Sequence, residues 1–174
     1  MSENSRSNNR RSELTEAAIE AFVEHGFEGT SVADLVTVVG MSKAAFGYHF
    51  ESKDALLVEL ATPLLDALAQ LETAITTDPE DIARYLDVLL THADVVAWID
   101  GDRSALSHPV VGTRISDHLS RVRTAWGDGS DAGEVRASMA IAALWRPIRN
   151  LEDRQIVATK DTVITTVAAM LARS

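Results

Sequence analysis

Side chains able to contact nucleic acid gather in residues 31–53, which read SVADLVTVVGMSKAAFGYHFESK. This short stretch contains Lys43, Tyr48, His49 and Lys53, together with serine hydroxyls that form hydrogen bonds. Lysine ammonium groups and polar side chains of this kind contact DNA phosphates, and side chains at the start of a helix can read base edges. The stretch therefore points to DNA binding.

Two short helices must position these side chains. Ser31 and Asp34 form the spacing of a capping box, which predicts a helix of about two turns that stops at Gly40. Ser42 predicts the N-cap of a second short helix through KAAFGYHF. The two are joined only by VGM, a glycine-containing turn typical of a helix-turn-helix. An alternative is that the two capped amphipathic helices are simply part of an all-α core.

Longer helices are expected on either side. The amphipathic segment SELTEAAIEAFVEHG ends at Gly26, a residue type suited to a left-handed helix cap. Ser52 predicts the cap of a helix that begins KDALLVELATPLLDALAQL, and apolar periodicity continuing beyond Pro63 predicts that this proline bends the helix without ending it. Residues 1–9 are polar and are expected to form a disordered arm.

The segment from Arg11 to about Leu60 shows the pattern AA…AF…HGFEGTSVADLV…VGMSK…YHFESKDALL. This pattern resembles the DNA-binding domain of the tetracycline-repressor (TetR) family of bacterial transcriptional regulators. The resemblance implies a DNA-binding domain over residues 10–68 and a variable helical domain for ligand binding and dimerisation over residues 69–174. It implies DNA contacts, most of them to phosphates, by Ser31, Ser42, Lys43, Tyr48, His49 and Lys53.

The second short helix departs from the Gly-Thr-Leu-Tyr that the family usually has. Here these positions are Ala44, Ala45, Phe46 and Gly47. Ala45 lacks a hydroxyl that can touch DNA, although alanine can still contact a thymine methyl, so Ala44 and Ala45 stay candidate base contacts. Gly47 lacks a tyrosine side chain and costs the helix about 1 kcal/mol relative to alanine. The alternative function is therefore a dimeric small-molecule-binding protein with weakened or lost DNA binding.

The charge of the chain is acidic, with a formal net charge of −10, and residues 1–60 hold five Lys or Arg against ten Asp or Glu. We expect weak non-specific DNA affinity, with useful binding only as a homodimer. The predicted partners are a double-stranded palindromic operator, an unidentified small-molecule effector and a second copy of the chain. Repression is favoured because the resemblance points to it.

Several other classes of protein are disfavoured. The chain has no cysteine, no apolar run long enough for a membrane span and no secretory signal at its N-terminus, so a cytoplasmic location is expected. It has no Gly-x-Ser-x-Gly elbow, no His-Glu-x-x-His zinc helix and no nucleotide-binding glycine loop. We expect no enzyme, no metal and no cofactor.

The second domain is also predicted to be helical, which makes the whole chain all-α. Asp78 and Pro79 begin a helix that runs through TDPEDIARYLDVLLTHADVVAWI, and DGDRSALSHP reads as a loop. An effector pocket is expected between the helices on either side of this loop, although a fully packed core would look similar. Its predicted lining is Leu89, His92, Val96, Ile115, His118, Leu119, Val122, Trp126 and Met139.

The helix over residues 134–150 has two apolar stripes on nearly opposite sides. One consists of Val135, Met139 and Ala142. A helix with two buried faces needs two neighbours, which favours a four-helix interface between two copies over a single larger core. The predicted dimer interface combines the other stripe with the last helix: Ala137, Ile141, Leu144, Ile148, Val163, Val167, Met170 and Leu171.

Overall fold

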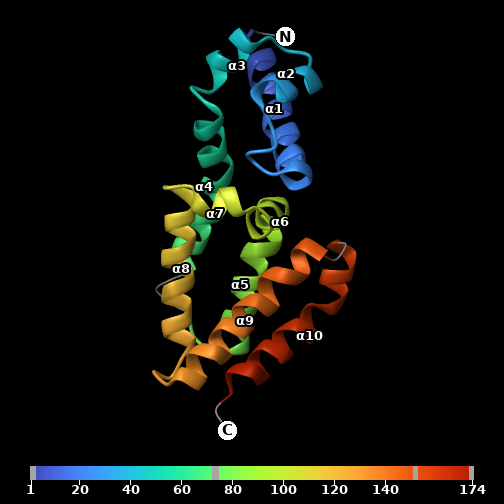
Figure 1. Ribbon diagram of the computed structural model, residues 1–174. Coiled ribbons are helices and arrows are strands. Elements are labelled where there is room, and N and C mark those ends of the chain that lie inside the picture. The colour runs from blue at the N-terminus through green and yellow to red at the C-terminus, as the bar shows by residue number, and fades with distance from the viewer. Residues whose placement is uncertain (1–2, 72–74, 151–152, 173–174) are drawn as a thin grey trace.

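The computed structural model describes residues 3–71, 75–150 and 153–172, and no β-strand occurs in these ranges. Its helices are α1 (Glu3–His25), α2 (Val32–Val38), α3 (Lys43–His49), α4 (Lys53–Leu71), α5 (Pro79–Thr91), α6 (Ala93–Gly101), α7 (Arg103–Ser107), α8 (Val111–Trp126), α9 (Asp131–Asn150) and α10 (Asp153–Leu171). The molecule is elongated, with α1–α3 at one end, α8–α10 towards the other, and α4 running between them (Figure 1). The predicted all-α fold is confirmed.

The N-terminal segment differs from the expected disordered arm. α1 begins at Glu3, so residues 3–9 are helical, while residues 1–2 lie outside the described residues. The side chain of Asn9 donates to Glu13 at 2.6 Å, and Arg10 forms an ion pair with the same carboxylate at 3.2 Å. Such pairs one turn apart favour helix, and extending a helix that already exists costs far less than starting one.

The first three helices pack around aromatic side chains. Phe22, Phe27, Phe46 and Phe50 are all buried, and the rings of Phe46 and Phe50 lie 5.8 Å apart. The two glycines that were expected to stop helices do so, since positive φ angles of 75° at Gly26 and 63° at Gly40 are easy only for glycine. The aromatic core and the glycine stops together fix how α2 and α3 lie on α1.

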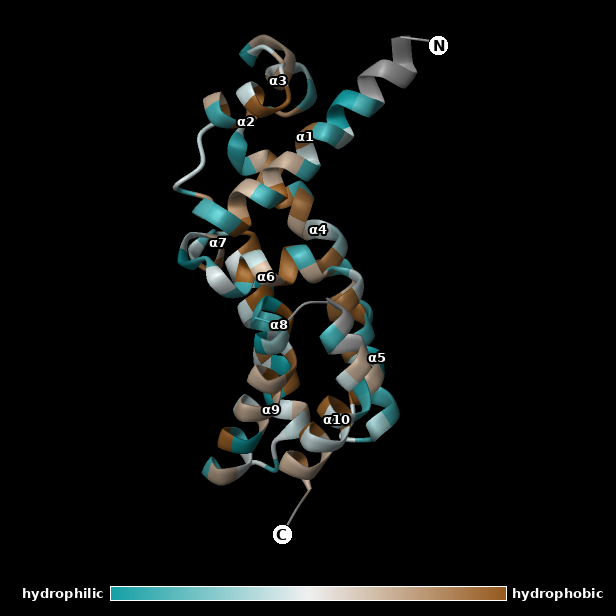
Figure 2. Ribbon diagram, turned by 90° about the vertical axis from the view of Figure 1, so that its right-hand side faces the viewer, coloured by the Kyte–Doolittle hydropathy of each residue, from teal (hydrophilic) through white to brown (hydrophobic). Residues whose placement is uncertain are grey.

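The long helix α4 connects α1–α3 to the rest of the chain. Pro63 lies exposed inside it, and the helix continues to Leu71, as its apolar periodicity predicted. Leu57, Leu64 and Leu68 are buried. Figure 2 shows hydrophobic residues, in brown, on both α4 and α6, and these two helices contact each other.

Two helix boundaries after residue 75 differ from the predictions. The segment after Pro79 was expected to be one helix, but it divides at His92, whose φ of −118° and ψ of 34° leave the helical region, into α5 and α6. Within the predicted loop, Asp102 caps the short helix α7 with its side chain. Capping by aspartate compensates the unsatisfied amides at a helix start, which is why this short helix forms.

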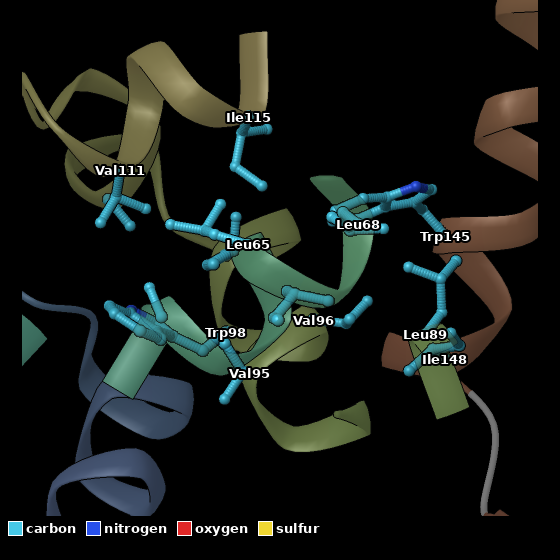
Figure 3. Close-up of a cluster of buried hydrophobic side chains, with 14 of the residues drawn as sticks. Leu65, Leu68, Leu89, Val95, Val96, Trp98, Val111, Ile115, Trp145 and Ile148 are labelled. Carbon is cyan, nitrogen blue, oxygen red and sulfur yellow. The ribbon is translucent and has the colours of Figure 1, made fainter. Parts of the chain in front are cut away.

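Most of the predicted effector pocket is hydrophobic core. Leu89, Val96 and Ile115 are buried, and they lie among Leu65, Leu68, Trp145 and Ile148 in one cluster (Figure 3). Val122, Trp126 and His118 are buried as well. Met139 lies outside this cluster, because it is 55% exposed on the outer side of α9.

The two stripes of α9 differ in burial. The stripe assigned to the dimer interface, Ala137, Ile141, Leu144 and Ile148, is buried within the chain's own core. The other stripe is exposed, with Val135 at 58% and Met139 at 55%. Val167 and Leu171 of α10 are buried, and Val163 and Met170 are half-buried. Both stripes have helical periodicity, and only the packing of α6, α8 and α10 against α9 determines which one faces inward.

Candidate nucleic-acid interface

The start of α2 has the capping box that the sequence predicted. The Ser31 hydroxyl oxygen accepts a hydrogen bond from the Asp34 amide at 3.2 Å, and the Asp34 carboxylate accepts one from the Ser31 amide at 2.9 Å. Hydrogen bonds from the Ser31 side chain and backbone lower the pKa of Asp34. Ser31 is exposed at the start of α2, and its hydroxyl also donates a hydrogen bond to the Asp34 carboxylate at 2.6 Å.

Helix α3 presents a narrow exposed face. Ser42 caps it by accepting a hydrogen bond from the Ala45 amide at 3.1 Å. Phe46 points into the core, and the opposite face exposes Lys43, Ala44, Gly47 and Tyr48. This face begins at the helix N-terminus, the part of a recognition helix that meets base edges in the major groove.

Tyr48 and Lys43 are the most accessible polar groups of α3. The Tyr48 side chain is 80% exposed, and its ring packs edge-on against His49 at 5.2 Å. Lys43 is exposed and has no ion-pair or hydrogen-bond partner among the residues that the structure describes. A lysine without a protein partner is available to a DNA phosphate at no cost in broken ion pairs.

Lys53 at the start of α4 and two arginines of α1 already bond to other residues of the chain. The Lys53 ammonium donates to the carbonyl oxygens of Phe27 and Thr30. Arg10 donates to the carbonyl oxygen of Val39, in the turn between α2 and α3, at 2.8 Å. Arg11 forms an ion pair with Glu59 at 2.6 Å. Lys53 and Arg10 thus hold the turns before and after α2, and Arg11 holds α1 against α4.

The predicted DNA-contacting residues thus fall into two groups. Ser31, Ser42, Lys43, Ala44 and Tyr48 are exposed on α2, α3 or their caps. Ala45, His49 and Lys53 are half-buried. Gly47, treated above only as a departure from the family pattern, belongs to the exposed face, and a side chain added there would meet no atom within 4 Å.

Other features of the molecule offer less specific chemistry. A cleft of about 460 Å³ lies between the two ends of the molecule, with Arg11 and Ile19 of α1, Glu59 of α4, and His92 and Asp94 among its lining. Within the described ranges no three His, Cys, Asp or Glu side chains cluster as metal ligands. Nor is any described helix long and apolar enough to cross a bilayer.

Comparisons with known proteins agree with this geometry. Residues 14–60 match the family described as bacterial regulatory proteins, tetR family. The chain is 28% identical over 156 residues to the HTH-type transcriptional repressor KstR2 of Mycobacterium tuberculosis, covering 82% of this chain and 78% of that protein. It is 28% identical over 144 residues to the HTH-type transcriptional repressor AcnR of Corynebacterium efficiens, covering 78% and 74%.

Solved structures show the same fold at lower identity. A transcriptional regulator from Aquifex aeolicus superposes with a TM-score of 0.66 at 22% identity, covering 92% of this chain and 99% of that one. A TetR-family transcriptional regulator from Bordetella parapertussis gives a TM-score of 0.70 at 16% identity, covering 94% of each chain. The two curated relatives are both described as repressors of transcription.

Proposed function

We propose that the chain, a member of the TetR family of bacterial regulatory proteins, is a DNA-binding repressor. It acts as a homodimer on a palindromic operator and responds to a small molecule. The exposed face of α3 is the observation that carries this proposal. Lys43 and Ala44 lie there at the start of a capped helix, and Tyr48 lies on the same face near its end. A helix with this exposure fits the major groove, and dimers of such domains bind half-sites about one helical turn, or a multiple of it, apart.

The proposed contacts divide by chemistry. Lys43, Ser31 and Ser42 are suited to phosphates, because each presents a cation or a hydroxyl at a helix start. Ala44 and Ala45 are suited to thymine methyl groups. Phosphate contacts position a protein on DNA, whereas base contacts give sequence preference.

Footprinting on genomic fragments tests this function. A protected palindrome that competes well against unrelated DNA is the expected result, and Lys43→Ala should weaken binding to every sequence alike. Ala44→Ser should instead change the preferred operator, because it alters a base contact. If no palindrome is enriched, the repressor proposal fails, and a dimeric small-molecule-binding protein becomes the better description.

The exposed stripe of α9 is the proposed dimer face. Val135, Met139 and Ala142 form an apolar surface that a monomer would leave in water. Arg123, Glu134 and Ser138 surround it, so the patch has the apolar centre and polar rim of a protein interface. This face replaces the predicted stripe, which the chain uses for its own core.

For the effector, the cleft beside His92 is the proposed entry. This cleft is already open, whereas the residues predicted to line a deeper pocket pack against one another in the core. Ligand pockets are usually largely pre-formed. A bound molecule would touch α1, α4 and the start of α6 together, and it would regulate DNA binding only if it favoured one arrangement of these helices.

A further inference from the structure

Asp102 is a carboxylate, 9% exposed, that lies between the two domains. Its Oδ2 atom accepts hydrogen bonds from the Phe27 backbone amide at 2.6 Å and from the Trp98 indole Nε1 at 3.0 Å. Its Oδ1 atom accepts from the amides of Ser104 at 2.8 Å and Ala105 at 3.4 Å, and from the Ser104 hydroxyl. Oδ1 therefore caps α7, and Oδ2 binds the Phe27 amide of the DNA-binding domain.

The Phe27 end of this contact lies in the turn before α2. Gly26 turns the chain with a φ of 75°, after which the Phe27 amide no longer has a helical partner and donates to Asp102. The carbonyl of the same residue accepts a hydrogen bond from Lys53. Phe27 is thus held at its amide by the second domain and at its carbonyl by α4, and α2 begins only five residues later.

The surroundings of Asp102 make its contacts hard to replace. The rings of Phe22 and Trp98 lie 5.1 Å apart, and those of Phe22 and Phe27 lie 5.5 Å apart, so the carboxylate sits beside an aromatic cluster. Burial raises the pKa of Asp102, but hydrogen bonds from Ser104, Phe27 and Trp98 outweigh it, and the net pKa lies below the ordinary value. A buried carboxylate is tolerated only with such a full set of donors.

We propose that Asp102 is a positioning residue for DNA binding, which fixes the turn before α2 and so sets the orientation of the helix-turn-helix relative to the second domain. The inference rests on the proposed DNA-binding function and adds the contact through which the second domain acts on it. Asp102 follows the last residue of α6, and α6 starts beside the cleft at His92. A shift of α6 therefore displaces the acceptor that holds Phe27.

Asp102→Asn is the informative variant, because an asparagine side chain has one acceptor oxygen where the carboxylate has two. Whichever way the amide turns, its NH₂ group faces donors, either those of α7 or those of Phe27 and Trp98. Asp102→Ser is the second variant. A serine keeps a short capping oxygen for α7 but is one atom too short to reach Phe27.

Asp128 offers a matched control. Its Oδ1 atom accepts from the Ser130 amide at 3.0 Å and from the Ser130 hydroxyl, as Asp102 does with Ser104. Its Oδ2 atom pairs with Arg136 at 2.7 Å, on α9 of the same domain. Asp128→Asn therefore removes the same kind of cap without touching the DNA-binding domain.

The experiment compares backbone amide exchange and operator affinity of these variants at a temperature where all are folded. In Asp102→Asn and Asp102→Ser, the amide hydrogens of residues 27–35 should exchange about tenfold faster than in wild type. Both variants should also bind the operator about tenfold more weakly. A tenfold effect is the size expected for the loss of a hydrogen bond to a charged group. Asp128→Asn should change neither by more than about twofold. A purely structural role would lower thermal stability in all three variants without this difference.

Equal exchange of amides 27–35 in the Asp102 and Asp128 variants would overturn the proposal. So would faster exchange in the Asp102 variants with unchanged operator affinity. If Asp102→Asn fails to fold, Asp102→Ser decides by the same two readouts. If the wild-type chain binds no DNA, the proposed function fails, whereas the exchange comparison still decides whether Asp102 holds the turn.

Discussion

The Nζ atom of Lys53 lies 2.7 Å from the carbonyl oxygen of Phe27 and 2.9 Å from that of Thr30. It also lies 4.1 Å from the centre of the Phe27 ring. The first residue of α4 thus closes the turn that leads into α2. The sequence predicts that this lysine contacts a DNA phosphate. The structure shows that it also donates hydrogen bonds to the turn before α2.

Lys53→Ala should therefore weaken the fold as well as DNA binding. Loss of two hydrogen bonds from a charged donor to partly buried carbonyls should lower the free energy of unfolding by about 1–3 kcal/mol. If the third ammonium hydrogen also reaches a phosphate, the salt dependence of DNA binding falls by about one. Lys43→Ala, which removes an exposed lysine, should lower DNA affinity and its salt dependence but leave the free energy of unfolding unchanged. If Lys53→Ala lowers stability but leaves the salt dependence of DNA binding unchanged, Lys53 stabilises the turn and does not contact a phosphate.

Tyr85→Phe should destabilise the second domain. The Tyr85 hydroxyl accepts a hydrogen bond from the Trp145 indole at 3.2 Å and lies 3.0 Å from Nε2 of His118, all within the core. Without this hydroxyl, the Trp145 indole N–H loses its acceptor and His118 loses one hydrogen-bond partner. The free energy of unfolding measured in urea should fall by about 1–3 kcal/mol. Tyr48→Phe, at an exposed position, should cost less than about 0.5 kcal/mol. Equal costs would contradict the buried network.

The same tyrosine should make stability depend on alkaline pH. Burial raises the pKa of Tyr85 well above its ordinary value of 10.0, so the folded chain keeps this proton where the unfolded chain loses it. The stabilisation is complete below pH 10 and declines as the pH rises above that value. Urea unfolding from pH 8 to pH 11 should show a steeper decline for wild type than for Tyr85→Phe. Parallel curves would show that Tyr85 is not the group responsible.

Local signals in the sequence predicted the DNA-binding end well, because they act over a few residues. Ser31, Ser42, Gly26 and Gly40 each satisfy a backbone requirement at their own position, namely a donor without a partner or a left-handed turn. The exposed face of α3 followed from placing Phe46 in the core. Function at this end was predictable through the same residues, since their spacing carries the family resemblance.

Long-range relationships were not predictable in this way. Periodicity showed that α9 has two apolar stripes, but only the neighbouring helices determine that Ala137 faces inward and Met139 outward. Similarly, Asp102 reads as an ordinary loop residue, and its contact with Phe27 joins positions 75 residues apart in sequence. A pattern of residue types contains no information on such pairs until the helices are packed.

Met139→Glu should separate the proposed dimer. A charge at the centre of an apolar interface is costly to bury unless a partner pairs with it, and here two copies of the charge would face each other or nearly so. The monomer should remain folded, because the Met139 side chain is exposed. Analytical ultracentrifugation should show a weakening of self-association by tenfold or more, on the order of the 1–3 kcal/mol cost of an unpaired polar group. Val23→Glu on exposed α1 is the control, and equal effects of both changes would place the interface elsewhere.

Gly47→Ala should stabilise the recognition helix. Gly47 lies inside α3 with a helical backbone, and an added methyl group would meet no atom within 4 Å. Alanine is favoured over glycine in a helix interior by about 0.8–1 kcal/mol, so thermal unfolding should shift upward. Gly40→Ala is the matched control, because it has equally open surroundings but a φ of 63°, and it should destabilise the chain. If the departure at Gly47 weakens DNA binding by loosening α3, Gly47→Ala should also raise operator affinity in a gel shift. A more stable variant with unchanged affinity would show that the flexibility of α3 is not what limits recognition.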